Sequence, residues 1–281
     1  MPELPEVETM CRGIQCIAGS RITRAVLLPC TRRPIRVIPN LGRLTRRVAG
    51  QQILAVGRLG KRVVLELERG DRLMIEPRMT GLMLLADPPS REHLRLRLDL
   101  ASGRVPHVWY WDRRGLGVVQ LLSARAFQSW LDRQPLGPDA LTISSAELVQ
   151  RLSPSRRPIK VALLDQRAIA GIGNLYAAEI LHRAGVHPAQ PCDQLAPRQW
   201  DALHAALRQV LREAIRLEGS TLSDGTYRNA LSRSGRYQTR HRVYGRAGQR
   251  CPTCRKGEIV RMVQAQRSSF FCPVCQPLGR D

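Results

Sequence analysis

Hydrophobic and polar residues repeat with two different periods along the chain. From Val7 to Ile17 the apolar residues recur at helical spacing, with Pro5 suited to the first turn and Gly19 to the C-terminal cap. From about residue 20 to 120 the pattern changes to short apolar or alternating runs, such as the strict alternation of Leu94–Leu100. Glycine, proline and aspartate separate these runs. This part of the sequence predicts an antiparallel β-sandwich or barrel that carries an N-terminal helix.

The second half returns to helical periodicity. After a short helix near 123–132, the pattern predicts helices over 144–152, from Pro158, after Asn174 and over 197–217, followed by a Gly-, Ser- and Arg-rich loop over 219–250. We therefore expect an α+β chain of two domains. The predicted segments are a β-sandwich domain at 1–135, a linker at 136–142, a mainly helical domain at 143–245 and a C-terminal module at 246–281.

Charge narrows the class of partner. The 281 residues hold 45 Lys plus Arg against 23 Asp plus Glu, a net charge of +22. Such a field attracts polyanions, so nucleic acid is the first candidate partner and an anionic membrane surface the second. No apolar run approaches the roughly 18 residues of a membrane span. The acidic, proline-bearing N-terminus is unlike a signal peptide, so we expect a cytoplasmic protein.

Cysteine spacing predicts a metal site. Four of the eight cysteines, Cys11, Cys16, Cys30 and Cys192, are scattered, whereas the other four form two CxxC pairs near the C-terminus. The pairs Cys251/Cys254 and Cys272/Cys275, separated by 17 residues, have the spacing of a zinc ribbon. We expect one structural Zn²⁺, with iron–sulfur or redox chemistry as the alternative.

Basic residues gather near this cluster. From Arg228 to Arg267 the chain has eleven basic residues and one acid, Glu258. Surfaces of soluble proteins usually mix both signs, so nucleic-acid binding explains this segment better than an ordinary solvated surface does.

Gly171-Ile-Gly-Asn174 precedes a predicted helix and offers free N–H groups at its positive end. Taken alone, it is better explained as an ordinary helix start, but Lys160 one helix upstream and the basic zinc module downstream favour a phosphate contact. The chain has only three lysines, Lys61, Lys160 and Lys256, and otherwise uses arginine, which makes each lysine a candidate for a role that needs a compact ammonium.

The N-terminus combines an amine with carboxylates. Glu3, Glu6 and Glu8 lie together in a strongly basic chain, and helix capping accounts for Glu6 and Glu8 but not for Glu3. Removal of Met1 would expose the secondary amine of Pro2. An α-amino group titrates near about 8, so part of it is neutral and nucleophilic at cellular pH. An amine and an adjacent acid suit Schiff-base chemistry at a sugar C1′.

Ordered motifs along almost the whole chain resemble the formamidopyrimidine-DNA glycosylase family, whose members are also called 8-oxoguanine DNA glycosylases. The four-Cys finger and seven further motifs carry the resemblance. These are Met1-Pro-Glu-Leu-Pro-Glu-Val-Glu-Thr9, Gly60-Lys-Arg62, Met79-Thr-Gly81, Asp112-Arg-Arg-Gly-Leu-Gly117, Leu136-Gly-Pro-Asp139, Gly171-Ile-Gly-Asn-Leu-Tyr176 and Val243-Tyr-Gly-Arg246.

The resemblance implies a β-sandwich with an N-terminal helix, then a helix–two-turns–helix domain and a zinc finger, with DNA bound in the cleft between. It implies that Pro2 is the nucleophile, Glu3 the general acid that assists opening of the sugar ring, and Lys61 a catalytic ammonium at a hairpin tip. Glu6 corresponds to a structural acid beneath the active site.

The resemblance also implies a set of DNA contacts. The matching positions are His93, Arg114, Lys160, Asn174 and Arg267. Base flipping leaves a hole in the duplex, and the residues that match the family's void-filling trio are Met79, Arg114 and Leu116.

Two motifs depart from the family pattern. Glu76-Pro77-Arg78 stands where the family usually has His-Leu-Gly before the methionine, and we expect Pro77 at a bulge or an edge position. The usual Asp-Pro-Arg-Arg-Phe-Gly becomes Asp112-Arg-Arg-Gly-Leu-Gly117. The chemistry is unaffected by either change, whereas the lesion preference is left open.

The sequence therefore predicts a bifunctional base-excision repair enzyme. It would remove 8-oxoguanine and formamidopyrimidines from damaged double-stranded DNA through a Schiff base on Pro2, then cut the strand by β,δ-elimination. The alternatives are an endonuclease VIII-type glycosylase for oxidised pyrimidines and a non-catalytic zinc-ribbon protein that binds damage. We expect a monomeric, nucleoid-associated bacterial protein.

Overall fold

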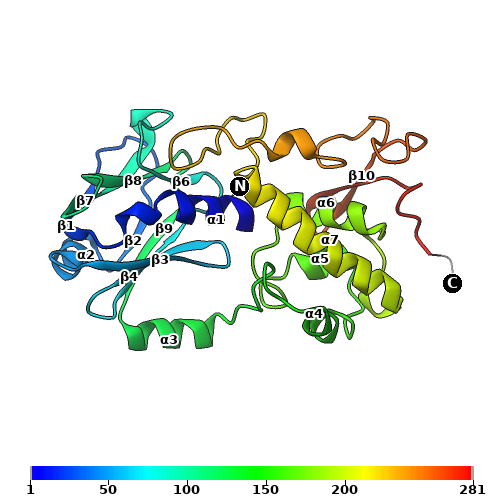
Figure 1. Cartoon of the computed structure of the whole chain (residues 1–281), viewed down its shortest axis with the longest axis horizontal. Helices are drawn as coiled ribbons and strands as arrows, with labels where there is room; N and C mark the ends of the chain where they lie inside the picture. The colour runs from blue at the N-terminus through cyan, green and yellow to red at the C-terminus, as the bar shows by residue number, and fades with distance from the viewer. Residues whose placement is uncertain (1, 280–281) are drawn as a thin grey trace. The chain divides into compact units, whose positions relative to one another are not determined.

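The computed structural model describes residues 2–279 and divides into two compact units. Of these residues, the first unit contains 2–135 and 215–238, and the second contains 136–214 and 239–279 (Figure 1). Residue 1 and the last two residues of the expected finger lie outside the described residues. Within the described chain, no helix is both long and apolar enough to cross a membrane. The expected domain boundaries remain predictions.

Two sheets form the first unit. One has the order β1-β7-β8-β6 and is antiparallel throughout; the other has the order β2-β9-β5-β4-β3 and is antiparallel except for the parallel pair β2/β9. Their strands are β1 (Arg21–Leu27), β2 (Arg36–Ile38), β3 (Ile53–Leu59), β4 (Arg62–Leu67), β5 (Arg72–Glu76), β6 (Gly81–Leu84), β7 (Leu94–Ala101), β8 (His107–Asp112) and β9 (Val118–Leu122). The sandwich predicted from the alternating runs is confirmed.

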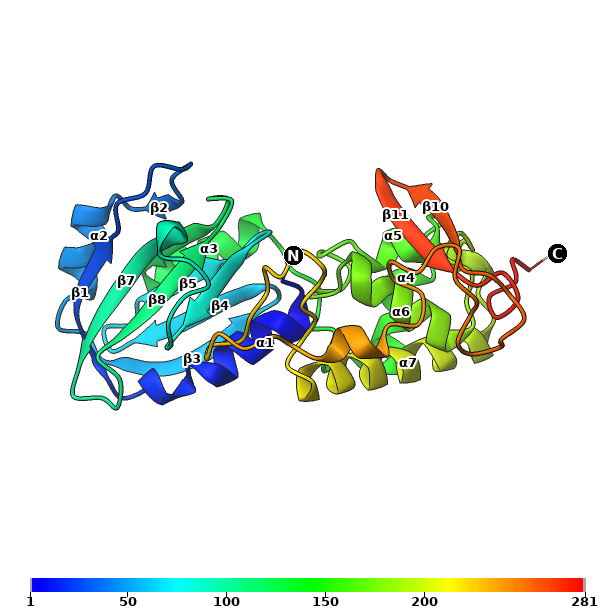
Figure 2. The ribbon, with the colours of Figure 1, turned by 90° about the horizontal axis from the view of Figure 1, so that it is seen from above.

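Helix α1 (Leu4–Gly13) lies along β3 and supplies one wall of the core (Figure 2). The expected helix over 5–17 is shorter than predicted, because Gly13 ends it and Gln15–Ile17 forms a 3₁₀ turn. Val7 and Ile17 are nevertheless both fully buried, as the helical spacing required.

A loop from a distant part of the sequence completes this core. Tyr227 and Ala230 are buried with the residues of both sheets and α1. A Cβ at Gly13 would lie 2.5 Å from the Cβ of Ala230, so only glycine allows this approach. The backbone N–H of Leu85 also donates to the carbonyl of Ala230 at 2.8 Å. These contacts explain why 215–238 belongs to the first unit.

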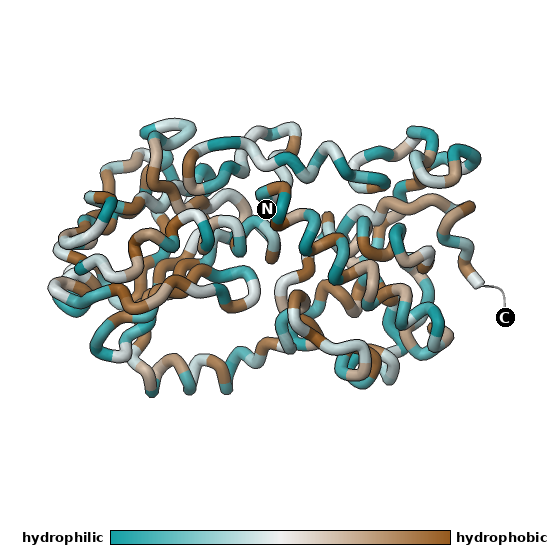
Figure 3. The backbone as a smooth tube through the Cα atoms, in the orientation of Figure 1, coloured by the Kyte–Doolittle hydropathy of each residue, from teal (hydrophilic) through white to brown (hydrophobic). Residues whose placement is uncertain are grey.

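Two short helices border the sheets. Helix α2 (Leu41–Val48) begins after Asn40, and α3 (Ala124–Arg133) begins after Ser123; each cap side chain accepts a hydrogen bond from a backbone N–H three residues ahead. Hydrophobic and hydrophilic segments alternate along α3 (Figure 3), and its buried Trp130 packs with the outer side of the five-stranded sheet.

The second unit is helical and ends in a hairpin. Its elements are α4 (Ser145–Leu152), α5 (Ile159–Leu163), α6 (Asn174–Ala184), α7 (Pro197–Arg216), β10 (Val260–Gln264) and β11 (Arg267–Phe271). The apolar residues whose helical spacing predicted α7 are buried from Trp200 to Ala214. Three further 3₁₀ turns of the chain, Arg91–His93, Cys192–Gln194 and Tyr237–Arg240, are too short for a periodicity to predict.

Candidate active site and DNA-binding residues

Glu6 organises the N-terminal segment. Pro2, Glu3 and Glu6 are all buried, the last two at 4% and 3% exposure. One carboxylate oxygen of Glu6 accepts from the N–H of Glu3 at 2.9 Å, and the other accepts from the N–H of Ser220 at 2.9 Å. The carboxylate thus holds the residue next to Pro2 and the 215–238 loop at the same time, which is the geometry required of a positioning acid.

Gly219 makes this approach possible. Its φ is +79°, and a Cβ there would lie 2.9 Å from a carboxylate oxygen of Glu6. The buried hydroxyl of Tyr227 donates to the backbone carbonyl of Glu6 at 3.4 Å. Burial raises the pKa of Tyr227 well above its ordinary value, and the charge of Glu6 acts in the same direction.

Lys61 lies at the tip of the β3–β4 hairpin, in the position expected for it. Gly60, with a φ of +57°, makes the tight turn. Two residues before the turn, the guanidinium of Arg58 donates to the carbonyl of Gly60 at 2.9 Å and to the carboxylate of Glu8 at 2.9 Å. Glu8 therefore connects α1 to the lysine's hairpin.

This role of Glu8 was missed from the sequence, where helix capping seemed a sufficient explanation. Burial tends to raise the pKa of the Glu8 carboxyl, but hydrogen bonds from Arg58 and Arg12 outweigh it and hold the pKa below its ordinary value. The signal that sequence reasoning could have used is that Glu8 is a third acid in this segment, more than helix capping needs.

Met79, Arg114 and Leu116 lie on two loops that a hydrogen bond joins. Met79 lies in the β5–β6 turn and is 37% exposed, while the other two lie between β8 and β9. The carboxylate of Asp112, fully buried, accepts from the Thr80 hydroxyl and from the N–H groups of Arg114 and Gly117, the last at 2.8 Å. The Thr80–Asp112 bond thereby ties the methionine's turn to the loop of the other two.

The structure gives a physical reason for both departures from the family pattern. Pro77 lies one residue beyond the end of β5, where no ladder N–H is needed, and its carbonyl accepts from Gly81 at 2.9 Å. Our expectation of a bulge or edge position was wrong for this reason. Gly115 has a φ of +61°, and a Cβ there would overlap the carbonyl of Arg33, so no arginine fits.

His93 closes a 3₁₀ turn and is buried. Its Nε2 lies 3.1 Å from a carboxylate oxygen of Glu92, and its ring packs edge-on against Trp111 with centroids 5.5 Å apart. Burial lowers the pKa of His93 below its ordinary value. The imidazole is therefore neutral near pH 7 in the protein without a bound anion.

Lys160, Asn174 and the finger hairpin meet at one carbonyl in the second unit. The Lys160 ammonium donates to the Ser268 carbonyl at 2.8 Å and to the Ser269 hydroxyl at 2.7 Å, and the Asn174 amide donates to the Ser268 carbonyl at 3.0 Å. Arg267 precedes these serines and is exposed. Lys160 is 1% exposed, so in this structure it fixes the hairpin that presents Arg267.

Glu179 is a further residue that sequence reasoning missed. Its carboxylate, on the α6 helix, accepts from the backbone N–H groups of Arg242, Val243 and Tyr244 at 2.8–3.0 Å. Burial raises the pKa of Glu179, and these N–H donors oppose the rise. The contact connects the helix that begins at Asn174 to the chain that enters the finger.

Four thiols converge in the second unit as the spacing predicted. The sulfurs of Cys251, Cys254, Cys272 and Cys275 all lie within 4.8 Å of one another, and the pairs 251/275 and 254/272 are 3.7 Å apart. Zn–S bonds of about 2.3 Å at tetrahedral angles require S–S edges of roughly 3.8 Å, so the four sulfurs fit one Zn²⁺. The predicted structural zinc site is confirmed.

The family models match all three parts of the chain. The N-terminal domain of formamidopyrimidine-DNA glycosylase matches residues 1–119, the H2TH domain of formamidopyrimidine-DNA glycosylase matches residues 136–226, and the zinc finger found in FPG and IleRS matches residues 248–278. The chain belongs to the formamidopyrimidine-DNA glycosylase family. Both the family and the zinc finger predicted from the motifs are thus confirmed.

Named relatives and solved structures match this chain over almost its full length. Formamidopyrimidine-DNA glycosylases of Chloroflexus aggregans and Chloroflexus aurantiacus are 43% and 40% identical, with coverage of 99% and 98% of both chains. Among solved structures, the Lactococcus lactis Fpg in complex with abasic-site DNA has a TM-score of 0.86 at 32% identity, covering 98% of this chain and 99% of that one. The Thermus thermophilus MutM (Fpg) protein has a TM-score of 0.85 at 37% identity, with coverage of 99% and 100%.

Proposed function

We propose that the protein is a bifunctional DNA glycosylase and abasic-site lyase that removes oxidised purines from duplex DNA. The observation that carries the proposal is the buried N-terminal cluster, in which Glu6 accepts from the backbone N–H of Glu3, the neighbour of Pro2, and from that of Ser220. Full-length similarity to enzymes named formamidopyrimidine-DNA glycosylase supports this reading. So does similarity to a relative crystallised with DNA that contains an N7-benzyl-Fapy-dG lesion.

The chemistry follows from the residue types. After Met1 is removed, the Pro2 amine attacks C1′ of the damaged nucleotide, and the glycosidic bond breaks with its electron pair leaving on the base. Glu3 donates a proton to the ring oxygen as the sugar opens, which leaves an iminium between Pro2 and C1′. The iminium acidifies the neighbouring C–H, so loss of that proton expels the 3′-phosphate and a second elimination expels the 5′-phosphate.

Lys61, Met79 and the second unit have supporting roles. The Lys61 ammonium provides positive charge beside the sugar–phosphate, and Met79, Arg114 and Leu116 fill the space that the extruded base leaves. Asn174, Arg267 and the zinc finger bind the backbone. We expect the protein to act as a monomer in the bacterial cytoplasm.

Borohydride trapping tests the nucleophile. The processed protein, mixed with a duplex that contains an abasic site and reduced with borohydride, should give a cross-linked species whose adduct maps to Pro2 by peptide mass spectrometry. A matched chain that retains Met1 should bind the duplex and give no adduct at residue 2. If the processed protein binds but forms no adduct, the lyase proposal fails and the non-catalytic damage-binding protein is favoured.

Lesion choice needs a separate assay. Single-turnover cleavage of matched duplexes with 8-oxoguanine or thymine glycol should be faster for 8-oxoguanine. Faster cleavage of thymine glycol would favour the endonuclease VIII-type alternative while leaving the Pro2 chemistry intact.

A further inference from the structure

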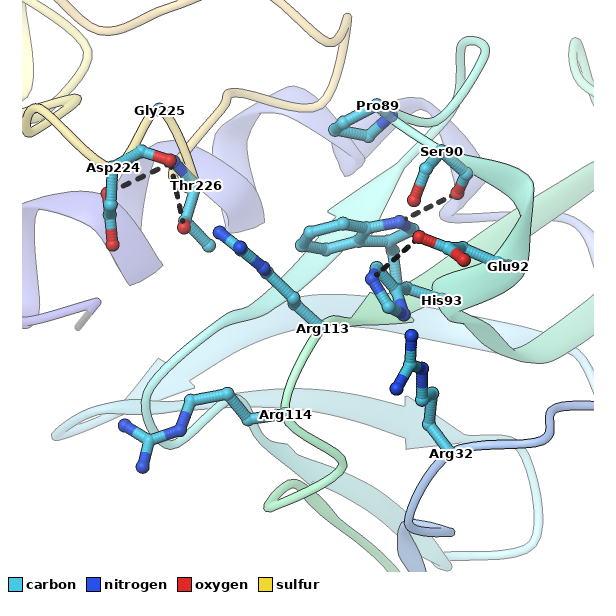
Figure 4. Close-up of a pocket in the computed structure, with 11 residues that line it drawn as sticks. Arg32, Pro89, Ser90, Glu92, His93, Arg113, Arg114, Asp224, Gly225 and Thr226 are labelled. Carbon is cyan, nitrogen blue, oxygen red and sulfur yellow. Dashed lines mark hydrogen bonds and ion pairs between the residues drawn. The ribbon is translucent and has the colours of Figure 1, made fainter.

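A polar cavity of about 580 Å³ opens on the first unit, outside the N-terminal cluster. Four segments supply its walls: residue 32, residues 89–93, the end of β8 with the loop after it, and the loop of residues 224–226. In Figure 4 the guanidinium of Arg113 extends toward Thr226, and that of Arg32 extends toward His93. The cavity therefore lies between two arginines from distant parts of the sequence.

Positive charge in this cavity is incompletely compensated. The guanidinium groups of Arg32, Arg113 and Arg114 have no hydrogen-bond or ion-pair partner among residues 2–279. The two acids of the lining have other partners within it: Glu92 lies 3.1 Å from His93, and Asp224 accepts from the Thr226 N–H at 3.1 Å. Three cations against two occupied carboxylates favour the entry of an anion.

The positive charge of these arginines also acts on the pKa of His93, which is lowered. Burial is the largest cause, and the charges of Arg95, Arg113 and Arg32 act in the same direction, while Glu92 opposes them. Two of these charges, those of Arg32 and Arg113, come from segments that lie 81 positions apart in the sequence.

The loop that carries Arg113 is held firmly at its base. The buried guanidinium of Arg95 donates to the carbonyl of Asp112 at 2.7 Å and to the carbonyl of Arg113 at 3.4 Å. The Asp112 carboxylate holds the loop from the other side. Because this backbone is held in place, Arg113 can bind an anion by ordering its side chain, with no rearrangement of its loop.

We propose that this cavity is a phosphate subsite in which Arg32 and Arg113 bind one backbone phosphate of the duplex. Guanidinium forks match phosphate oxygens with paired, charge-assisted hydrogen bonds. The subsite is separate from the void-filling role of Arg114. It rests on the proposed function in one respect, that duplex DNA is the ligand.

The salt dependence of binding tests the subsite. The probe is a short duplex with a tetrahydrofuran abasic analogue, and the variants are R32Q, R113Q and their double mutant. Loss of one neutralised phosphate should lower the slope of log K against log salt by about 0.9. Two exposed arginines outside the cavity, in Arg24→Gln and Arg104→Gln, are the matched controls and should leave the slope within error of wild type.

Methylphosphonate substitution locates the contact. With one phosphate neutralised at a time, the wild-type protein should lose affinity several-fold at one position at which the R32Q/R113Q protein loses none. An unchanged slope in the double mutant, or equal losses for both proteins at every position, would overturn the subsite. Thermal melts verify that the variants are folded.

Failure of the subsite and failure of the proposed function give different results. Borohydride trapping on Pro2 by the wild-type protein tests the proposed function, whereas the salt slopes of the arginine variants test the subsite. If the wild-type protein gives no adduct, the lyase proposal fails, and the slopes of log K against log salt are unaffected.

Discussion

The carboxylate of Glu8 accepts from the guanidinium of Arg58 at 2.9 Å, and this ion pair joins the N-terminal helix to the hairpin that carries Lys61. The Arg58 side chain is 8% exposed and that of Glu8 is 18% exposed. The pair therefore receives little screening from solvent, unlike a pair on the open surface. This ion pair therefore connects the helix that follows Pro2 and Glu3 to the hairpin of Lys61.

Glu8→Gln should destabilise the first unit by about 1–3 kcal/mol, because it removes the carboxylate charge that faces the largely buried Arg58 guanidinium. Urea unfolding measures the loss, and single-turnover excision should slow as the hairpin loosens. Arg12→Gln is the matched control: Arg12 is the other partner of Glu8 but is 63% exposed, so its loss should cost only about 0.5 kcal/mol. Equal effects of the two variants would contradict the linking role of Arg58.

The stability of the second unit should fall as the pH drops from about 6.5 toward 4. Burial lowers the pKa of His241 to about 4, with the charge of Arg246 acting in the same direction, and burial likewise lowers that of His182 to about 4. In the unfolded chain these histidines have a pKa of about 6.5. Below that pH the unfolded chain binds protons that the folded chain does not bind, so each histidine lowers the stability as the pH falls.

The urea midpoint measured between pH 7 and pH 4.5 should therefore decrease, and His241→Gln should make the decrease smaller. The glutamine side chain stays neutral throughout this range, which removes one of the two contributions. A variant with the same pH profile as the wild type would show that His241 titrates normally.

His182 should strengthen zinc binding through Cys251. Its Nε2 lies 3.6 Å from the Cys251 sulfur, and its Nδ1 is buried with no hydrogen-bond partner in the described part of the chain. The bare lone pair is best placed on Nδ1, which puts the ring proton on Nε2, toward the metal-bound thiolate. Removing such a second partner of a ligand typically weakens metal affinity about 10-fold or more.

Chelator competition that follows zinc release tests this contact. His182→Phe should release zinc more readily than wild type, and His182→Gln, which keeps an N–H donor, should recover part of the affinity. His204→Phe is a control, because that ring contacts the Ile143 carbonyl and lies outside the cysteine cluster. Identical release from the His182→Phe and wild-type proteins would rule out the hydrogen bond.

The sequence by itself determined the features that depend on local period and spacing. Alternation in Leu94–Leu100 predicted a half-buried strand, and the stripe of α7 predicted its buried face. Two CxxC pairs predicted the zinc site, because four sulfurs at that spacing have few other uses. Ordered motifs predicted the family, because so many matching residues in the same order do not arise by chance.

Only the tertiary structure decided the relationships between distant segments. No period connects Glu6 to Ser220 or Glu8 to Arg58, since each pair meets only after the sheets and loops pack. The same holds for Arg32 and Arg113, which line one cavity. Lys160 shows the limit most clearly: its residue type and position suggested a DNA contact, whereas its ammonium is buried against Ser268 and Ser269. A side chain's burial and partners depend on what the rest of the chain brings beside it, which local sequence does not specify.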